Sequence, residues 1–248
     1  MVIMSIKLVS INIEGQKHLE NVRELLEREN PEVICFQECF PETIEDMTND
    51  NWPYKFFVPT YKVDQNEQGL KYSADRQWGE AILSKLQISE KTVLRVTMEA
   101  YGPDNLPGHG VDNHLPTILL ATIGGIRVGT THFTWTPIAS VTARQRDHVE
   151  ELLKMIKGEE LVLCGDFNIP RGNEMYQKLS EKYLDNIPAS IESTLDPILH
   201  YANKDNPGRL KLVVDYIFST PEYRVSNVRT VEGVSDHCAI LCEIDKLI

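Results

Sequence analysis

The chain lacks any apolar run near the ~20 residues that a transmembrane helix needs. Its first 13 residues have no basic start, no long apolar core and no small-residue cleavage site, so they predict a first strand rather than a signal peptide. From these absences we expect a soluble, cytoplasmic protein without membrane insertion. We also expect it to be a monomer.

Linkers, repeats and low-complexity tracts are missing as well. No stretch rich in proline, glycine or serine separates two halves of the chain. With 248 residues, 42% of them hydrophobic, the chain can bury a substantial core. The polar fragments described below come from both ends of the sequence. We therefore predict a single domain over residues 1–248.

Positive charge is scarce, with 25 Lys and Arg against 37 Asp and Glu and a net charge of -12. Proteins that bind long nucleic acids through electrostatic interactions alone are more often basic. This balance argues against tight, non-specific binding of a duplex. It does not exclude a nuclease, because a bound metal and a local basic rim can replace an overall positive charge.

Cysteines are few, odd in number and without the spacing of a zinc site. Most of them lie in apolar runs: Cys35, Cys39, Cys164, Cys238 and Cys242. This pattern predicts reduced, buried thiols rather than disulfides or metal ligands.

Apolar and β-branched runs predict many short strands and fewer helices. The expected strands are 6–11, 33–36, 54–58, 78–83, 93–96, 117–123, 126–133, 161–164, 211–219, 223–231 and 238–244. The expected helices are 18–30, 41–47, 142–157 and 173–183. We place 78–83 and 93–96 in a second sheet, and we pair 117–123 with 126–133 around Gly124-Gly125. The pattern favours an α/β (α+β) sandwich of mixed sheets with helices packed outside.

Acidic and amide side chains recur along the whole chain, most of them at the end of a predicted strand. Six fragments carry them: Asn12-Ile13-Glu14, Gln37-Glu38, Thr131-His132-Phe133, Gly165-Asp166-Phe167-Asn168, Val214-Asp215-Tyr216 and Ser235-Asp236-His237. Strands of one sheet can bring their ends together although they are distant in sequence. We expect one pocket of carboxylates, amides and imidazoles, which suits a divalent metal and a phosphate ester.

The fragment around Asp166 is the strongest local signal. Gly165 lets the backbone turn after the strand, and Asp166 and Asn168 point the same way if the chain is extended. The carboxylate could hold a metal or its water, and the amide could orient a nucleophile or a phosphate oxygen. The structural alternative is an Asx turn that caps the strand.

The fragment around His237 places an acid and a base side by side before a strand. His237 suits proton transfer near neutral pH, and we expect Asp215 to orient it. The structural alternative for Asp215 is a buried acid that accepts backbone N–H groups. For Ser235 we prefer a turn or a helix cap.

Glu38 follows a wholly apolar strand, where a carboxylate is costly unless it is liganded or paired. We make it the principal metal ligand. Asn12 could bind the metal or a phosphate oxygen, or it could be a turn residue. His132 ends a hairpin strand, and Glu80 in the strand 78–83 could pair with it.

Basic and aromatic side chains flank the fragments. Among them we favour Arg144 and Arg171 as contacts for substrate phosphate, although each alone could be a solvated surface charge. Trp135 could stack on a base or a sugar, or it could anchor its loop in the core.

Taken in order from Asn12 to His237, these fragments resemble the endonuclease/exonuclease/phosphatase superfamily. The resemblance implies a four-layered sandwich of two packed mixed sheets flanked by helices, and cleavage of phosphoester bonds with Mg²⁺ or Mn²⁺. It implies a metal site at Asn12, Glu38 and Asp236. Asp166 and Asn168 would position the nucleophile and the phosphate. His237, backed by Asp215, would be the catalytic imidazole, and His132 a second imidazole on the phosphate.

This pattern predicts in-line attack of water on phosphorus. A nuclease is the first hypothesis, because nucleic acids are common substrates in the superfamily and because Trp135 and the flanking arginines suit them. The alternative is a phosphatase or phosphodiesterase on a small phosphorylated metabolite or lipid headgroup, which the acidic charge favours. A catalytically inactive scaffold is a minor alternative. We expect the loops 61–76, 101–113 and 133–141 to carry specificity.

Overall fold

The computed structural model describes residues 5–48, 50–62, 77–96 and 116–247. Within these residues the strands are β1 (Ile6–Asn12), β2 (Val33–Cys39), β3 (Tyr54–Lys62), β4 (Gln77–Ser84), β5 (Ile88–Arg95), β6 (Thr117–Ile123), β7 (Ile126–His132), β8 (Val162–Asp166), β9 (Leu184–Asp185), β10 (Asp215–Ser219), β11 (Tyr223–Val231) and β12 (Ala239–Lys246). The α-helices are α1 (Leu19–Glu29), α2 (Pro41–Thr48), α3 (Ala143–Met155) and α4 (Glu174–Ser180). Two 3₁₀ turns are η1 (Pro137–Ala139) and η2 (Tyr201–Asn203).

The strands form two six-stranded sheets with a similar plan. The first has the order β11-β12-β1-β2-β4-β3 and the second the order β5-β6-β7-β8-β10-β9. Each sheet holds one parallel pair, β1 with β2 and β7 with β8, and the other neighbours are antiparallel. The carboxyl ends of a parallel pair lie at the same edge of a sheet. Each sheet therefore delivers two strand ends, and the residues that follow them, to one place.

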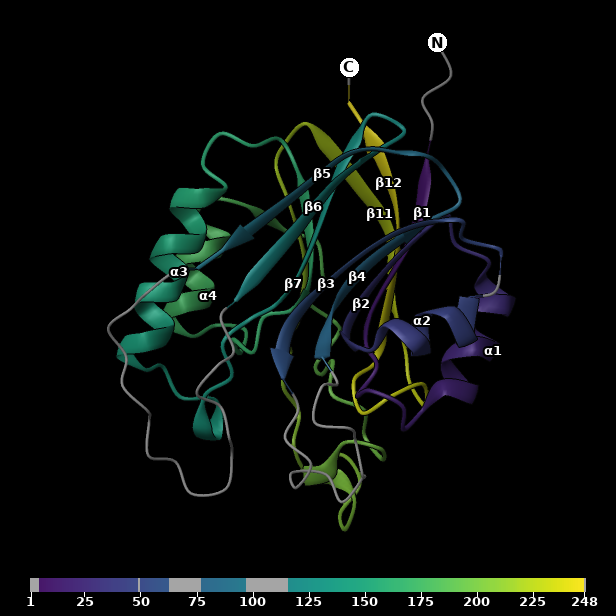
Figure 1. Ribbon diagram of the computed structural model, residues 1–248. Helices are drawn as coiled ribbons and strands as arrows, with labels where there is room; N and C mark the ends of the chain where they lie inside the picture. The colour runs from purple at the N-terminus through teal and green to yellow at the C-terminus, as the bar shows by residue number, and fades with distance from the viewer. Residues whose placement is uncertain (1–4, 49, 63–76, 97–115, 248) are drawn as a thin grey trace.

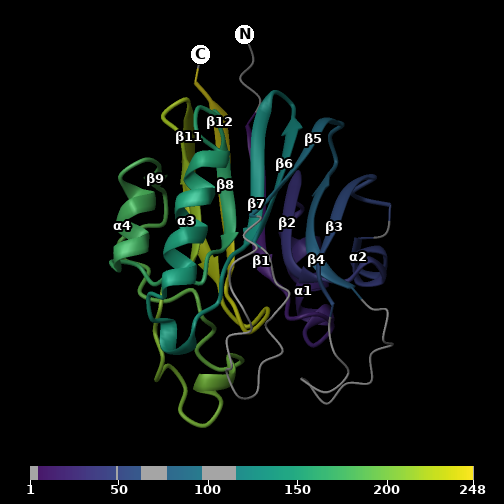
Figure 2. The ribbon, with the colours of Figure 1, turned by 60° about the vertical axis from the view of Figure 1, so that its left-hand side comes forward.

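The sheets pack face to face, and helices cover their outer faces (Figures 1 and 2). Helices α1 and α2 lie on the first sheet, and α3 and α4 lie on the second. Side chains alternate along β1 and β2 as a pleated strand requires: Leu8 and Cys35 belong to the core between the sheets, whereas Val9 and Ile34 belong to the core beneath α1 and α2. The four-layered α/β sandwich is thus confirmed.

The hairpin of β6 and β7 forms where the sequence predicts it. Gly124 and Gly125 have φ of 58° and 82°, which is the conformation of a two-residue turn that other residues rarely adopt. The five cysteines are buried and free, as predicted. No helix in the described part of the chain is long and apolar enough to cross a membrane.

Two strand predictions are wrong in detail. The strands 78–83 and 93–96 do not share a sheet: β4 lies between β2 and β3 in the first sheet, and β5 is at the edge of the second. The predicted strand 211–219 begins only at Asp215, because the residues before it bond a different segment. There the Thr194 hydroxyl accepts the N–H groups of Val214 and Asp215 at 3.0 and 3.1 Å.

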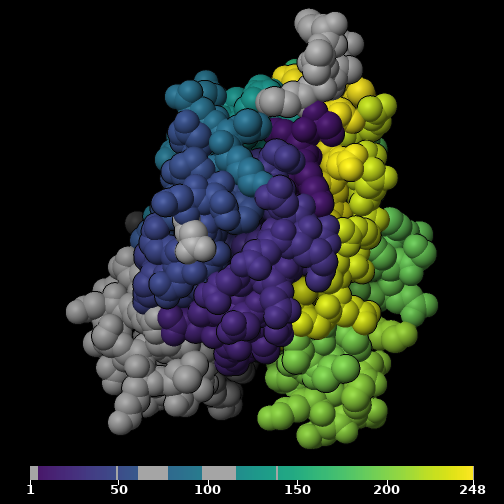
Figure 3. Space-filling model, turned by 90° about the vertical axis from the view of Figure 1, so that its right-hand side faces the viewer, coloured from purple at the N-terminus to yellow at the C-terminus, as the bar shows by residue number. Residues whose placement is uncertain are grey.

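A long connection, residues 186–214, joins β9 to β10 and lies beyond one end of the sandwich. Figure 3 shows it as the bright green segment that projects next to the yellow residues before β12. It carries η2 and the exposed Tyr201. This connection lies next to the strand ends and shapes the site described below.

Candidate functional site

The ends of β1, β2, β7 and β8 meet at one edge of the sandwich. They bring Asn12, Glu38, His132 and Asp166 to a single cleft, and the segment before β12 adds Asp236 and His237. The cleft has a volume of about 760 Å³. The prediction that distant fragments share one pocket therefore agrees with the structure for these residues.

Gly165 is required by the close approach of β7 and β8. A Cβ atom at this position would lie 2.0 Å from the carbonyl oxygen of Thr131, and φ is 131°. The residue is still paired within β8, so it does not turn the chain as expected. The turn follows at Asn168, which has φ of 53° and donates its N–H to Asp166 Oδ1 at 2.8 Å. The Asx turn is present, and the expected extended chain is not.

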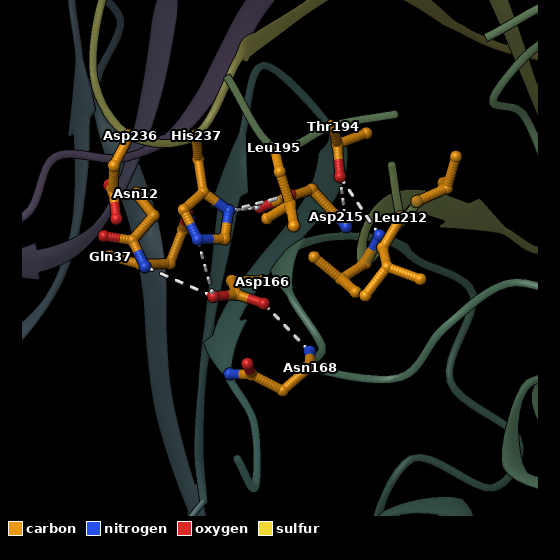
Figure 4. A network of polar contacts seen from close by, with 12 residues as sticks. Asn12, Gln37, Asp166, Asn168, Thr194, Leu195, Leu212, Asp215, Asp236 and His237 are labelled. Carbon is orange, nitrogen blue, oxygen red and sulfur yellow. Dashed lines mark hydrogen bonds and ion pairs between the residues drawn. The ribbon is translucent and has the colours of Figure 1, made fainter. Parts of the chain in front are cut away.

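The second carboxylate oxygen of Asp166 is the centre of the site. It accepts Asn12 Nδ2 at 3.2 Å and lies 3.6 Å from His132 Nε2 and 3.7 Å from His237 Nε2. Figure 4 shows Asn12 and His237 both directed at this carboxylate. The side chain of Asn168 donates to the Phe133 carbonyl at 3.2 Å, which fixes the amide at the cleft.

His237 is oriented from behind by Asp215. The ring Nδ1 lies 2.9 Å from Asp215 Oδ2 and 3.1 Å from Oδ1, so Nδ1 carries the proton and Nε2 faces Asp166. Burial alone would lower the pKa of His237, but the carboxylates of Asp215, Asp166 and Asp236 outweigh burial and raise the pKa well above its ordinary value. The protonated, positively charged form of the ring is therefore favoured.

His132 has different surroundings. Its Nε2 lies 3.5 Å from Glu38 Oε1, and burial is the main cause that lowers its pKa. Glu80 accepts the backbone N–H of His132 at 3.3 Å, which differs from the expected pair between Glu80 and the ring. Burial raises the pKa of Glu80 well above its ordinary value, so the protonated form of this acid is favoured.

Glu38 and Asp236 are the acids that line the cleft beside Asp166. Glu38 has φ of 54° and sits where the pairing of β2 with β4 shifts register, so a bulge directs its side chain. Burial and the nearby Asp236 raise the pKa of Glu38 to about 8. Burial, with Glu14 nearby, raises the pKa of Asp236 to about 6. A cation between these acids would relieve the cost of ionising both.

Asn12 is bonded through both its amide nitrogen and its amide oxygen. Its Nδ2 donates to Asp166, and its Oδ1 accepts the N–H of Glu14 at 3.1 Å. Its oxygen retains one lone pair for a metal. The side chains of Asp166, Asp215 and His237 also place possible ligand atoms within 4.8 Å of one another. Since Asp215 is bonded to the ring, we interpret this trio as an oriented imidazole rather than a metal cage.

Two of the three predicted substrate contacts line the cleft. They are Arg144, near the start of α3, and Trp135, which follows β7. The third, Arg171, is not among the residues that line the cleft. Its guanidinium is bonded to Asp185 at 3.1 Å and to the carbonyls of Pro188, Ile191 and Ile187, so it clamps the chain after β9.

The sequence reasoning missed the wall formed by the connection between β9 and β10. Leu195 pairs with His237 in an isolated antiparallel bridge, and the Thr194 carbonyl accepts the N–H of Cys238 at 2.7 Å. His200 also lines the cleft, with its ring centroid 6.2 Å from that of His237. Residues 186–210 lie outside every strand and helix that the sequence predicts, so no sequence signal marks them. Of the loops expected to carry specificity, 133–141 contributes to the cleft, whereas 63–76 and 101–113 lie outside the described residues.

The comparisons with known proteins agree on one family and one fold. The model of the endonuclease/exonuclease/phosphatase family matches residues 9–237. No curated protein matches the chain by sequence. The solved structure of an endonuclease/exonuclease/phosphatase from Bacteroides vulgatus is similar over 98% of this chain and 99% of its own, with a TM-score of 0.69 and 17% identity.

Two further solved structures have more specific names. A mannosyl-6-phosphatase of Bacteroides thetaiotaomicron is 14% identical, with 96% of this chain and 99% of that chain covered and a TM-score of 0.65. The catalytic domain of human Nocturnin, solved with a bound sulfate anion, is 16% identical, with 98% and 95% covered and a TM-score of 0.65. At these identities the likeness concerns the fold alone.

Proposed function

Since the chain belongs to the endonuclease/exonuclease/phosphatase family, we propose that it hydrolyses compact phosphoesters with the help of a divalent metal. One observation carries the proposal: Asp166 lies between two imidazoles and one amide, beside the acids Glu38 and Asp236. Carboxylates and neighbouring imidazoles are the groups that metal-assisted attack of water on phosphorus requires. A buried structural ion pair would not need two imidazoles on one carboxylate.

The metal would be held by Glu38 and Asp236, with the remaining lone pair of Asn12 Oδ1 as a third donor. These are hard oxygen donors, which suit Mg²⁺ or Mn²⁺. The raised pKa of both acids, to about 8 and about 6, is the structural reason to expect a cation between them. When bound, the metal supplies positive charge that offsets the charge of the phosphate group.

His237 is the positively charged partner of the phosphate. Asp215 holds Nδ1–H, so the Nε2–H of the imidazolium can donate to a phosphate oxygen in the cleft. The donor is fixed before the substrate arrives, because Thr194 in turn bonds the backbone of Asp215 at 3.1 Å. Such a preorganised donor stabilises the charge that develops on the phosphate oxygens.

Asp166 and Asn168 orient the attacking water. Asp166 Oδ2 is the acceptor at the centre of the site, and it takes a proton of the water as the new oxygen–phosphorus bond forms. The bond between phosphorus and the ester oxygen of the substrate breaks on the other side of phosphorus, and that oxygen leaves as an alcohol after it takes up a proton from water. The Asn168 amide is held by the Phe133 carbonyl and contributes a neutral group to the same cleft. His132, neutral because burial lowers its pKa, adds a second imidazole beside the same oxygen of Asp166.

The size and charge of the cleft favour a compact substrate. A volume of about 760 Å³ lies within the range typical of small-molecule sites. Among its described lining residues the lysines and arginines are Lys17 and Arg144, and Lys17 is paired with Glu14. A long polyanion needs a track of basic residues. We therefore place a small phosphoester before the nuclease hypothesis.

Cleavage of nucleic acid remains the second candidate, and aromatic residues at the cleft favour it. Trp78, Trp135 and Tyr201 all line it. Aromatic rings can stack on exposed bases of single strands. This candidate predicts that single-stranded oligonucleotides are cleaved better than duplexes.

Hydrolysis of a mixed panel with Mg²⁺ or Mn²⁺ tests both candidates. The panel contains hexyl phosphate, glucose 6-phosphate, bis-alkyl phosphate, single-stranded DNA, RNA and plasmid. We expect release from small esters that excess EDTA abolishes and that Asp166→Asn loses. Asp245→Asn is the matched control, because Asp245 bonds Arg224 on β11 at 2.8 Å and does not line the cleft. Full turnover in EDTA, or in Asp166→Asn, would exclude the proposed site.

A further inference from the structure

The connection between β9 and β10 builds one wall of the cleft, and apart from the bond between Thr194 and the backbone of Asp215 it takes no part in the chemistry described above. Residues 194–196 dock along the segment that carries His237. The Leu195–His237 bridge is flanked by two hydrogen bonds, from Cys238 N–H to the Thr194 carbonyl at 2.7 Å and from Asp196 N–H to the Asp236 carbonyl at 2.8 Å. Leu195 is therefore fixed beside the proposed catalytic imidazole (Figure 4).

The rest of this wall is held by two buried side chains. Asp196 accepts the N–H groups of Ile198 and Leu199 at 2.9 and 2.7 Å, and that of Gly233 at 2.6 Å. Asn203 donates to the carbonyls of Asp196 and Leu210 and accepts the Leu210 N–H at 2.7 Å. With these bonds the connection has a defined shape before any ligand binds. A preformed wall loses little entropy on binding, so its contacts contribute fully to affinity.

The wall presents an uncharged and largely apolar surface. It contributes six residues to the lining of the cleft: Leu195, His200, Tyr201, Leu210, Leu212 and Val214. His200 Nδ1 accepts the N–H of Ala202 at 3.3 Å, and burial lowers its pKa to about 4, so its ring is neutral. Tyr201 packs on His200, with ring centroids 4.5 Å apart, and 73% of the residue is exposed at the mouth.

The charged residues of the same connection do not line the cleft. Lys204, Arg209 and Lys211 are exposed, none of them belongs to the lining, and Lys211 is paired with Glu192 at 2.9 Å. A polyhydroxylated group such as a sugar would need several donors and acceptors on this side. The wall offers the His200 ring and the Tyr201 hydroxyl, beside four aliphatic side chains.

We propose that this wall binds the organic group of the substrate and that this group is apolar, an alkyl or aryl substituent joined to the phosphate through oxygen. The proposal rests on the proposed function, because it places the phosphate at His237 and Asp166. The substituent then extends from the phosphate along Leu195, Leu212 and Leu210. A preference for an apolar substituent would distinguish this chain from enzymes that bind phosphorylated sugars.

Binding of alkylphosphonates to the whole protein tests the wall without any turnover, because a C–P bond is not hydrolysed by this chemistry. Calorimetric titration with methyl-, butyl- and hexylphosphonate in Mg²⁺ should give a Kd that falls about two- to fourfold per methylene until the wall is covered. Butylphosphonate should bind at least about threefold more tightly than 3,4-dihydroxybutylphosphonate, whose hydroxyls lack partners on the wall. Equal affinity across the series, or a preference for the diol, would overturn the proposal.

Three leucine variants locate the effect. Leu212→Ser and Leu210→Ser change half-buried residues of the wall and should flatten the dependence on chain length while methylphosphonate binding stays within about twofold. Leu184→Ser is the matched control, because Leu184 is 55% exposed on β9 and lies outside the cleft lining. A dependence on chain length that survives in both wall variants would contradict the assignment.

The failure of this inference can be separated from failure of the proposed function. If the Kd is the same across the phosphonate series while small esters of the panel are hydrolysed, the proposed role of the wall is wrong and the proposed hydrolysis stands. If the Kd falls with the length of the alkyl chain but no ester is hydrolysed, the wall stands as a binding site and the proposed hydrolysis is wrong. Circular dichroism of each variant confirms that the fold is retained.

Discussion

The two imidazoles of the site lie at nearly equal distances from Asp166, 3.6 Å for His132 and 3.7 Å for His237, yet their pKa values shift in opposite directions. Both rings are largely buried, and each histidine has an acid besides Asp166 nearby, Asp215 for His237 and Glu80 for His132. Asp215 bonds the ring of His237, whereas Glu80 bonds the backbone of His132, and burial raises the pKa of Glu80. An acid raises the basicity of an imidazole only if it is ionised and reaches the ring.

This difference gives the site one imidazole whose charged form is favoured and one whose neutral form is favoured, both beside a shared carboxylate. The charged ring can attract the phosphate, and the neutral ring can donate without adding to the charge that must be buried. The four predictions that follow change the shared carboxylate, the acid that bonds the ring of His237, the imidazole of His132 and then the acid that bonds the His132 backbone. They are ordered from the largest expected effect to the smallest.

Replacing Asp166 with Asn removes the group that both imidazoles share. We expect kcat to fall by about 10⁴, because the site loses its proton acceptor and the anchor for Asn12 together. The measurement is steady-state turnover of the best ester in the panel, beside Asp245→Asn. A variant that keeps more than about a tenth of the activity would show that Asp166 does not take part in the reaction.

Replacing Asp215 with Asn keeps the shape of the support behind His237 but removes its charge. We expect kcat to fall by about 10³, because the ring loses both its preferred tautomer and the carboxylate that raises its pKa. KM should change far less than kcat, since Asp215 does not touch the substrate. A loss confined to KM would indicate that Asp215 only shapes the cleft.

Replacing His132 with Gln should have a smaller effect, a fall in kcat of about 10², because one neutral donor is lost while the imidazolium remains. The ratio between the losses in Asp215→Asn and His132→Gln measures the difference between the two sides of Asp166. Equal losses would mean that the two imidazoles have the same role.

Replacing Glu80 with Gln should leave kcat within about twofold, because Gln can still accept the His132 N–H through its side-chain oxygen. Stability should change instead. The pKa of Glu80 is raised in the folded protein above its ordinary 4.5, so folding binds a proton and stability falls as pH rises above about 4.5. The variant removes this penalty.

We therefore expect Glu80→Gln to melt a few degrees higher than the original protein at pH 8 and to lose that advantage as pH approaches 4.5. Thermal unfolding at several pH values measures the difference. Glu24→Gln, at an exposed position of α1, is the control and should show no such trend. A lower melting temperature at pH 8 would show that Glu80 is ionised and paired in the folded protein.

Much of the fold could be predicted because the local pattern and the tertiary environment agree. The β6–β7 hairpin needs two residues with positive φ, and Gly124-Gly125 supplies them. Helix α3 was expected over 142–157 and spans Ala143–Met155, with the Thr142 side chain accepting the Gln145 N–H as an N-cap. The assignment of β4 to a sheet failed, because strand spacing alone does not say which neighbour a strand pairs with.

In the candidate site, too, some residues could be selected from the local sequence and others only from the tertiary structure. Glu38 could be selected because a carboxylate after an apolar strand is costly unless it is used. Asp166 could be selected from its fragment, whereas the metal role of Asp236 came from the resemblance alone. Arg144 and Arg171 could not be separated, since both are arginines close to a polar fragment. Only the packing shows that Arg144 lines the cleft and that Arg171 is bonded to Asp185 and three carbonyls.

The sequence by itself determined which polar groups stand at the ends of which strands, because side-chain alternation and burial are local properties of a strand. The tertiary structure alone decided their protonation and their partners. The pKa of His237 depends on Asp215, Asp166 and Asp236, which come from three segments of the chain, and Leu195 reaches His237 only because residues 194–196 dock beside it. Electrostatic interactions add through space, so a group's charge follows from the fold and not from its neighbours in sequence.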